Sequence, residues 1–237
     1  MMNDRDRIGR RSILKVGIVS LTGLSSPASI AAQERTSDTI NPDEGVTATE
    51  DLMKEHGVLS RCLLIYEEAT RRLRNKEEIT PEVFHHAADL IRNFVEQYHE
   101  RNEEKYIFPV FEKHKKLVDL VQTLKIQHKA GREVTERILH LSTPDQFRLQ
   151  DNSHILVASC QSFIRMYRPH KSREDTVLFP ALRSLLTPRQ VEALGDKMEE
   201  DEHKVLGDEG FEKSVDQVAS IEKALGIYDL NQFTPKG

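Results

Sequence analysis

The chain has 237 residues, with 34 basic and 39 acidic side chains and a formal net charge of −5. This acidic balance does not provide the basic surface that binds nucleic acid or anionic membranes, so neither is expected as a partner. The only cysteines, Cys62 and Cys160, are not in a CxxC motif, which excludes a disulfide scaffold. We expect two buried thiols, with a single bridge between them as the alternative.

Residues 1–32 have the organisation of an export signal. Their basic beginning contains four arginines, Arg5, Arg7, Arg10 and Arg11. An apolar stretch at 16–24 follows, too short to span a bilayer, and then small residues up to Ala32. The run Arg10-Arg11-Ser12-Ile13-Leu14-Lys15 resembles the bacterial twin-arginine signal, which carries folded proteins. We therefore expect the protein to be periplasmic or otherwise exported. The alternative for this segment is a disordered basic N-terminus or an uncleaved anchor.

Cleavage after Ala31 or Ala32 would remove most of the basic charge near the N-terminus. Residues 1–32 contain five basic and two acidic side chains, so the formal charge of the mature chain becomes −8. Residues 33–47 are then expected to form a polar linker. No stable membrane insertion is expected after cleavage.

The rest of the chain is predicted to be helical almost throughout, because apolar residues recur at spacings of three and four and no strand pattern occurs. The expected helices are 48–74, 81–107, 115–141, 146–175, 188–205 and 208–225. Proline at a first helical position marks three starts, after Thr80, Thr143 and Thr187. Pro109 and Pro180 should end or kink their helices, and Gly226 should cap the last one.

The sequence HxxxExxxxFP occurs twice. The copies are His99, Glu103, Phe108 and Pro109, then His170, Glu174, Phe179 and Pro180. Each copy has a lone histidine on an earlier predicted helix, His56 at 43 residues before His99 and His128 at 42 before His170. All four histidines continue apolar stripes, so they should point into the core. Each glutamate lies one helical turn after its histidine, about 6 Å along the axis, within reach of one ion.

Burial of these six side chains predicts a dinuclear metal site. A single histidine on an apolar face is more often a hydrogen-bonded core residue. Two glutamates and four histidines in one core, however, would carry a desolvation penalty of several kcal/mol per unpaired charge, which a pair of cations offsets. Mixed imidazole and carboxylate ligands without thiolate, in a helical bundle, suit iron first and manganese or zinc less well.

The order of these residues resembles the hemerythrin-like, or HHE cation-binding, family over about residues 48–185. The resemblance implies an all-α, up-down four-helix bundle, followed by a C-terminal helical extension at 186–237. It also implies two non-haem iron ions joined by an oxo or hydroxo bridge. The histidines would be terminal ligands and the glutamates would bridge the irons: His56, His99, His128, His170, Glu103 and Glu174. The stretch around 210–213 and 232–235 is similar to a tail in a bacterial subset of the family.

The sequence departs from oxygen-carrying hemerythrins, which have two histidines four residues apart on the third helix. The corresponding neighbours of His128 are Leu124 and Arg132. Each iron would then keep an open position for a small diatomic or peroxide ligand. We expect binding and reduction of oxygen, hydrogen peroxide or nitric oxide, with electrons from an unidentified donor. The alternatives are a non-catalytic carrier or sensor of oxygen or nitric oxide, and a protein for iron storage or delivery.

The other histidines and the core tyrosines are weaker candidates. Five histidines are expected to be solvated: His85, His86, His114, His140 and His154. His203 lies in an acidic run that is charged on all faces, so a solvated position is expected, with an outer role at the site as the alternative. Four tyrosines are expected to pack in the core or to donate hydrogen bonds to bound ligands: Tyr66, Tyr98, Tyr106 and Tyr167.

Overall fold

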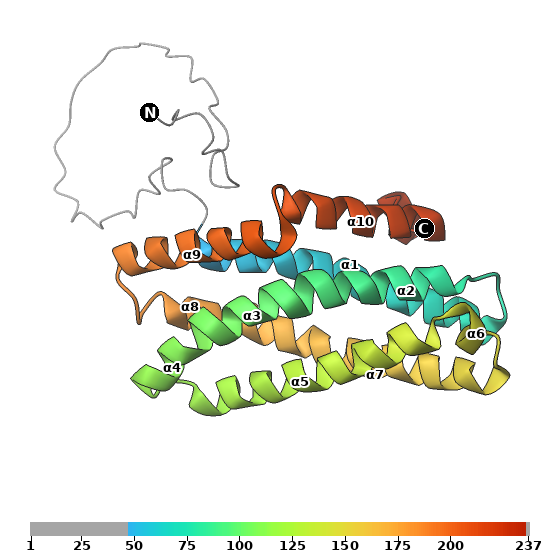
Figure 1. Cartoon of the computed structure of the whole chain (residues 1–237), viewed down its shortest axis with the longest axis horizontal. Coiled ribbons are helices and arrows are strands. Elements are labelled where there is room, and N and C mark those ends of the chain that lie inside the picture. The colour runs from blue at the N-terminus through green and yellow to red at the C-terminus, as the bar shows by residue number, and fades with distance from the viewer. Residues whose placement is uncertain (1–46, 236–237) are drawn as a thin grey trace, which may run out of the picture. The chain divides into compact units, whose positions relative to one another are not determined.

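The computed structural model describes residues 47–235, in which four long helical segments lie side by side, each antiparallel to the next along the chain (Figure 1). The first segment is α1 (Ala48–Asn75) and the third is α5 (Val118–Leu141). The second is α2 (Pro81–Leu90), η1 (Ile91–His99), α3 (Glu100–Asn102), η2 (Glu103–Ile107) and α4 (Phe108–His114). The fourth is α7 (Gln150–Arg173), η3 (Glu174–Leu178) and α8 (Phe179–Leu182), after the single turn α6 (Pro144–Phe147). The described residues contain no strand, which confirms the all-α, up-down bundle.

The four segments form a closed square, because α1 packs against α2 and α7, and α5 packs against the same two helices. Two further helices cover one side of it. Helix α9 (Pro188–Leu206) lies along α1 and η1, and α10 (Gly210–Leu225) lies along α1 and α2, before the short 3₁₀ turn η4 (Leu230–Phe233) (Figure 1). The Arg61 guanidinium donates to both carboxylate oxygens of Glu222, at 2.9 and 2.6 Å, and so fastens α10 to α1.

The helix starts agree with the predicted ones within about four residues, the largest difference being α7, which begins at Gln150 rather than at 146. The second and fourth segments continue beyond their predicted ends at 107 and 175, to His114 and Leu182. Helix α5 begins at Val118 rather than at 115, because Lys115 and Leu117 have left-handed backbone, with φ of 54° and 52°. At the start of α9, the Gln190 side chain accepts a hydrogen bond of 2.8 Å from the backbone N–H of Thr187. Gly226 caps α10 in the left-handed conformation, as predicted, with φ of 69°.

The prolines of the repeated motif do not end their helices. The chain stays helical past Pro109 to His114 and past Pro180 to Leu182. In both places a π-helical turn, η2 or η3, comes directly before the α-turn that contains the proline. Each proline then occupies the beginning of an α-helical stretch, directly after the π turn. A π turn rather than a helix end therefore accommodates the proline.

The apolar core is divided into two clusters by a polar layer. Along α1, Leu52 belongs to one cluster and Leu59 to the other, and His56 lies between them. The same order occurs on α7 and η3, where Tyr167 and Leu178 belong to different clusters. The predicted histidines and glutamates occupy this layer, so apolar side chains separate it from solvent at both ends.

Both cysteines are free thiols in the larger apolar cluster, as predicted, and each is fully buried. Burial raises the pKa of the Cys62 thiol to about 12 and also raises that of Cys160. Because only the thiolate reacts with disulfide reagents, we expect neither cysteine of the folded protein to react with Ellman's reagent at about pH 8, and both to react after unfolding. Rapid labelling of the native protein would contradict this burial.

Two features of the chain outside the bundle need separate mention. The predicted export signal at 1–32 and the linker at 33–47, except for Thr47, lie outside the described residues. No helix within residues 47–235 combines the length and the apolar character that a membrane span requires.

Candidate metal centre

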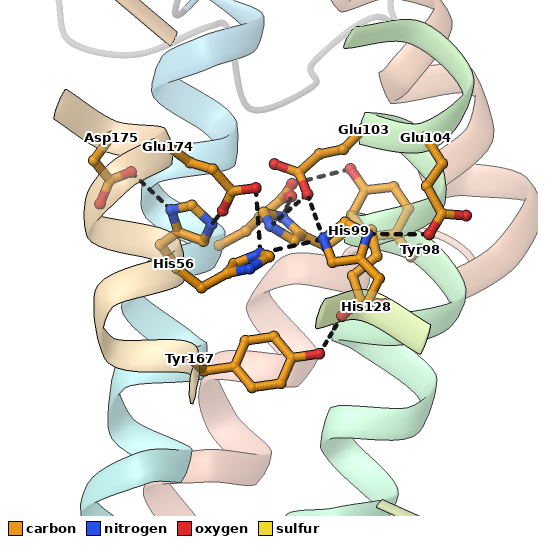
Figure 2. Close-up of polar contacts among 12 residues, drawn as sticks. His56, Tyr98, His99, Glu103, Glu104, His128, Tyr167, Glu174 and Asp175 are labelled. Carbon is orange, nitrogen blue, oxygen red and sulfur yellow. Dashed lines mark hydrogen bonds and ion pairs between the residues drawn. The ribbon is translucent and has the colours of Figure 1, made fainter. Parts of the chain in front are cut away.

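The structure brings all six predicted residues together in the polar layer, although they come from every long segment of the bundle (Figure 2). Their donor atoms form two groups, each within 4.8 Å: His56 with His99 and Glu103, and His128 with His170 and Glu174. All six are buried, and the two glutamates are 0% exposed. His56 is on α1 and His128 on α5. Glu103 and Glu174 are each the first residue of a π turn.

Each glutamate reaches one histidine of each group. Glu103 Oε2 lies 3.8 Å from Nε2 of His99 and 3.4 Å from Nε2 of His128. In the same way, Glu174 Oε1 lies 3.2 Å from Nε2 of His170, and its Oε2 lies 3.3 Å from Nε2 of His56. The two carboxylates therefore span the gap between the groups from opposite sides.

The central atoms match the donor set of a metal site. Both oxygens of Glu103, both oxygens of Glu174 and Nε2 of His56 are buried and form no hydrogen bond. Such atoms carry a large desolvation cost when nothing compensates them. Ligands at about 2.0–2.2 Å from one ion stand roughly 3–4 Å apart, which agrees with the separations of 3.2–3.8 Å between these nitrogens and oxygens. The residues present therefore fit a pair of cations.

Each imidazole is oriented by an acceptor on its outer nitrogen. Nδ1 of His56 lies 2.7 Å from Asp175 Oδ1, and Nδ1 of His99 lies 2.8 Å from Glu55 Oε2. With an oxygen acceptor there, Nδ1 carries the proton and Nε2 presents its lone pair to the centre.

The second pair of histidines repeats this arrangement. Nδ1 of His128 lies 3.0 Å from Glu104 Oε1, and Nδ1 of His170 lies 2.8 Å from Gln127 Oε1. Glu104 and Asp175 directly follow Glu103 and Glu174 in the sequence. Each of these two acceptors therefore comes from one repeated unit and orients the lone histidine of the other. All four Nε2 atoms thus face one region, and those of His128 and His170 lie 3.2 Å apart.

The phenylalanines of the repeated motif also contact histidines of the opposite unit. The ring of Phe179 stacks on His56 at 5.7 Å between centroids, and Phe108 stacks on His128 at 5.5 Å. Each HxxxE segment therefore supplies one histidine of its own. It also contacts the lone histidine of the other unit through its central glutamate, through the carboxylate that follows this glutamate and through its phenylalanine ring. This exchange explains why the motif extends as far as its phenylalanine.

The electrostatics of the cluster favour cations. Burial lowers the pKa of His56, but the adjacent Asp175 and Glu174 carboxylates outweigh burial and raise it to about 10. Burial opposes ionisation of Glu174 as well, yet the neighbouring His170 and His56 hold its pKa below the usual value. The layer attracts positive charge, whether protons or metal ions, and the two compete for the same nitrogens.

A third acidic group beside the site is paired with an arginine. Glu100 and Glu104 lie within reach of His128, but the Arg132 guanidinium is 2.8 Å from Glu100 Oε2 and 2.7 Å from Glu104 Oε1. Burial raises the pKa of Glu104, but the contacts with His128 and Arg132 outweigh burial and lower it to about 2. Arg132 thus supplies the cation for these two carboxylates.

The remaining predicted candidates lie outside the centre. His86, His114, His140 and His154 are exposed, as expected, whereas His85 is half-buried with Nδ1 at 3.2 Å from the Ser142 hydroxyl. Three tyrosine hydroxyls donate to carboxylates away from the central atoms: Tyr98 to Glu55, Tyr106 to Asp201 and Tyr167 to Glu100. The Tyr66 hydroxyl is buried in the larger cluster without a hydrogen bond.

His203 lies on the outer face of α9, with its side chain 51% exposed and 3.3 Å from Asp208. The buried acidic residue of this run is instead Glu202, which accepts a hydrogen bond of 2.9 Å from the Phe211 N–H at the start of α10. We expect His203→Ala to leave the metal content of the purified protein unchanged, as measured by elemental analysis. Loss of metal would assign this segment to the site.

The outer acceptors were missed by reasoning from sequence, which considered only residues on apolar stripes. A signal was present, because the duplication extends to them: Glu55 precedes His56 as Gln127 precedes His128. Similarly, Glu104 follows Glu103 as Asp175 follows Glu174. Comparing the residues adjacent to the two repeated units would have selected all four.

Comparison with known proteins agrees with this geometry. The family model described as the hemerythrin HHE cation binding domain matches residues 47–182. An uncharacterized protein of Mycobacterium bovis is 41% identical over 233 residues, covering 96% of this chain and 91% of the relative. Uncharacterized proteins of two Mycobacterium tuberculosis strains match with the same identity and coverage. No solved structure matches the chain.

Proposed function

The chain belongs to the hemerythrin HHE cation-binding domain family, and on this premise we propose that it is a non-haem di-iron protein that binds and reduces a small oxidant. The single observation that carries the proposal is the convergence of four Nε2 atoms and two buried carboxylates in a layer whose imidazoles are all fixed by outer acceptors. Oxygen, hydrogen peroxide and nitric oxide are the candidate oxidants.

Iron is favoured over other metals by the ligand types. Imidazole and carboxylate without thiolate, two ions in the core of a helical bundle and bridging glutamates are the environment in which proteins hold di-iron pairs. In this proposal, His56 and His99 would bind one ion and His128 and His170 the other. Glu103 and Glu174 would bridge them, because each lies between histidines of both groups.

Reduction is favoured over reversible carriage by the negative charge around the site. Besides Glu104, which is paired with Arg132, two central carboxylates and two outer ones, Glu55 and Asp175, surround the histidines and would stabilise the ferric state. When bound here in the diferrous state, such a pair would supply two electrons. With hydrogen peroxide, two electrons and two protons break the O–O bond and yield two molecules of water; an external donor must then restore the electrons.

Access and shielding are provided by the chain itself. With Leu124 and Arg132 in place of a second histidine beside His128, each ion would have only two imidazoles and the two shared carboxylates as protein ligands, fewer than six. The apolar clusters on both sides of the layer, together with Phe108 and Phe179 against the histidines, exclude bulk water. A small molecule can then bind without competition from many waters.

The test is metal analysis and absorption spectroscopy of the anaerobically purified protein, titrated in turn with oxygen, hydrogen peroxide and nitric oxide. We expect two irons per chain, and consumption of the oxidant in proportion to a supplied electron donor. A stable, reversible adduct without consumption would support carriage instead, and facile transfer of iron to an apo acceptor would support metal delivery. One ion per chain, or none, would contradict the di-iron assignment.

We also propose export by the twin-arginine route, on the strength of the Arg10-Arg11 pair and the apolar stretch that follows it. This route carries folded proteins and would allow the metal centre to be loaded before translocation. Changing both arginines to lysine, in Arg10→Lys/Arg11→Lys, is expected to retain the precursor in the cytoplasm, as measured by cell fractionation and immunoblotting. Unchanged export of this variant would contradict the route.

A further inference from the structure

The two metal positions have unequal surroundings, although the unit that forms them is duplicated. The inequality lies in the outer acceptors rather than in the central ligands. His99 donates its Nδ1–H to the Glu55 carboxylate, whereas His170, its counterpart, donates to the Gln127 amide oxygen. The distances are the same, 2.8 Å each, so the difference is one of charge and not of reach.

Both side-chain oxygens of Glu55 face hydrogen-bond donors. Its Oε2 accepts from His99 Nδ1, and its Oε1 accepts from the Tyr98 hydroxyl at 3.0 Å. An ionised carboxylate can accept both hydrogen bonds, whereas a carboxylic acid would place its own O–H beside one of these two donors. Gln127 has the same length but carries no charge, and its Oε1 is the atom that faces His170.

The second difference concerns the other histidine of each group. Asp175 accepts from His56 Nδ1 at 2.7 Å and has no cationic partner except that histidine among the described residues. Glu104 accepts from His128 Nδ1 at 3.0 Å, but it also binds the Arg132 guanidinium at 2.7 Å. The arginine withdraws electron density from Glu104, so His128 has a weaker acceptor than His56.

Both differences act in the same direction. A carboxylate that accepts from the outer N–H makes an imidazole a stronger electron donor, and a neutral or charge-compensated acceptor does so less. Stronger donors favour the higher oxidation state of a bound iron, because second-shell hydrogen bonds and local charge set its reduction potential. Accordingly, His56 and His99 form the more electron-rich position, and His128 and His170 form the less electron-rich one.

We propose that Glu55 and Gln127 are positioning residues that make the two irons inequivalent, so that the His128/His170 position is reduced first and the His56/His99 position last. The inference rests on the proposed di-iron function and deepens it. In the one-electron-reduced protein the ferrous ion would be at the His128/His170 position. A small oxidant that requires ferrous iron would therefore meet the side of the layer formed by α5 and α7.

The test exchanges the two acceptors without changing their size. Glu55→Gln and Gln127→Glu are made in the iron-loaded full chain, and the two one-electron midpoint potentials are measured by spectroelectrochemical titration. Repulsion between two irons separates the midpoints in any such pair, so the informative quantity is the change caused by each variant. Mössbauer spectra of protein loaded with ⁵⁷Fe report whether the valences are localised.

The two variants should act on different steps. Gln127→Glu is expected to lower the potential of the first reduction, and Glu55→Gln to raise that of the second, so that each narrows the separation. We expect the comproportionation constant to fall by about tenfold in each, equivalent to about 59 mV for a one-electron step. Gln217→Glu on exposed α10 adds the same charge far from the site and should leave both potentials unchanged.

Arg132→Gln provides an independent variant if Glu55→Gln loses iron. Removing the cation from Glu104 should lower the potential of the first reduction and again narrow the separation. Unchanged potentials in Gln127→Glu and Arg132→Gln, with iron content retained, would overturn the inequivalence but leave the di-iron function standing. A wider separation in these variants would overturn the assigned order. Failure of the wild-type chain to bind two irons would instead overturn the proposed function.

Discussion

Replacing Glu103 or Glu174 by alanine is expected to lower the iron content to about half of the wild-type value or less. Each carboxylate lies between histidines of both groups, with oxygen to nitrogen distances of 3.2–3.8 Å. Loss of one carboxylate should therefore weaken the binding of both ions, whereas loss of a terminal histidine should directly weaken the binding of only one. Because alanine also removes a buried charge from an apolar core, the metal-free variant should still fold.

The measurement is elemental analysis of protein purified under identical conditions, with helical content followed by circular dichroism. Glu133→Ala is the matched control, since this glutamate is exposed on α5 and outside both groups of donor atoms. It should bind as much iron as the wild type. Full iron content in both Glu103→Ala and Glu174→Ala would mean that neither glutamate is a ligand.

Gly131→Ala should destabilise the protein strongly, although it adds only one methyl group. A Cβ at Gly131 would stand 2.0 Å from the Tyr167 hydroxyl oxygen and 2.8 Å from the ring carbon that bears it. The tyrosine is 1% exposed and donates a hydrogen bond of 2.5 Å to Glu100, so its ring has little freedom to move. Overpacking costs about 1–3 kcal/mol, and loss of a buried hydrogen bond to a charged group costs about 1.5–3 kcal/mol. We expect a decrease of about 3 kcal/mol in the free energy of unfolding.

Urea unfolding of the metal-free protein measures this effect, and a second glycine provides the control. Gly57 is exposed within α1, and a Cβ there would meet nothing within 4 Å. Gly57→Ala should therefore raise the free energy of unfolding by about 0.5–1 kcal/mol, through helix propensity alone. In a Tyr167→Leu background the cost of Gly131→Ala should shrink, because the clashing hydroxyl is gone. Equal effects of the two glycine substitutions would show that Tyr167 does not constrain α5.

Much of the fold was predictable because helical periodicity is local. The boundaries of α1 and α10 agree with the predicted ones within about two residues, and Gly226 caps α10 as expected. Pro109 and Pro180 were predicted to end or kink their helices, and the first of these alternatives was wrong, because both helices continue past the proline. Proline ordinarily ends or kinks a helix, and the π turn that precedes each of these two was not predicted from the sequence.

The six central residues were also predictable, for a different reason. His56 and His128 could be recognised as candidates only because each stands at nearly the same distance before an HxxxE pair. The duplication makes this spacing visible in a single sequence. The spacing places His99 and Glu103 on one face of a helix, which is a local property. Membership of the site could therefore be inferred before any contact between segments was known.

The sequence by itself determined most of the helices, the duplicated unit and which histidines and glutamates are buried together, because helical periodicity is local and the duplication is visible in the spacing. Only the tertiary structure decided that Glu103 spans His99 and His128, and that the phenylalanine of each unit stacks on a histidine of the other. It also decided that the acceptor of His170 is Gln127 and not a carboxylate. Contacts of this kind join helices through space, and their pairing depends on how the four segments pack rather than on spacing along any one of them.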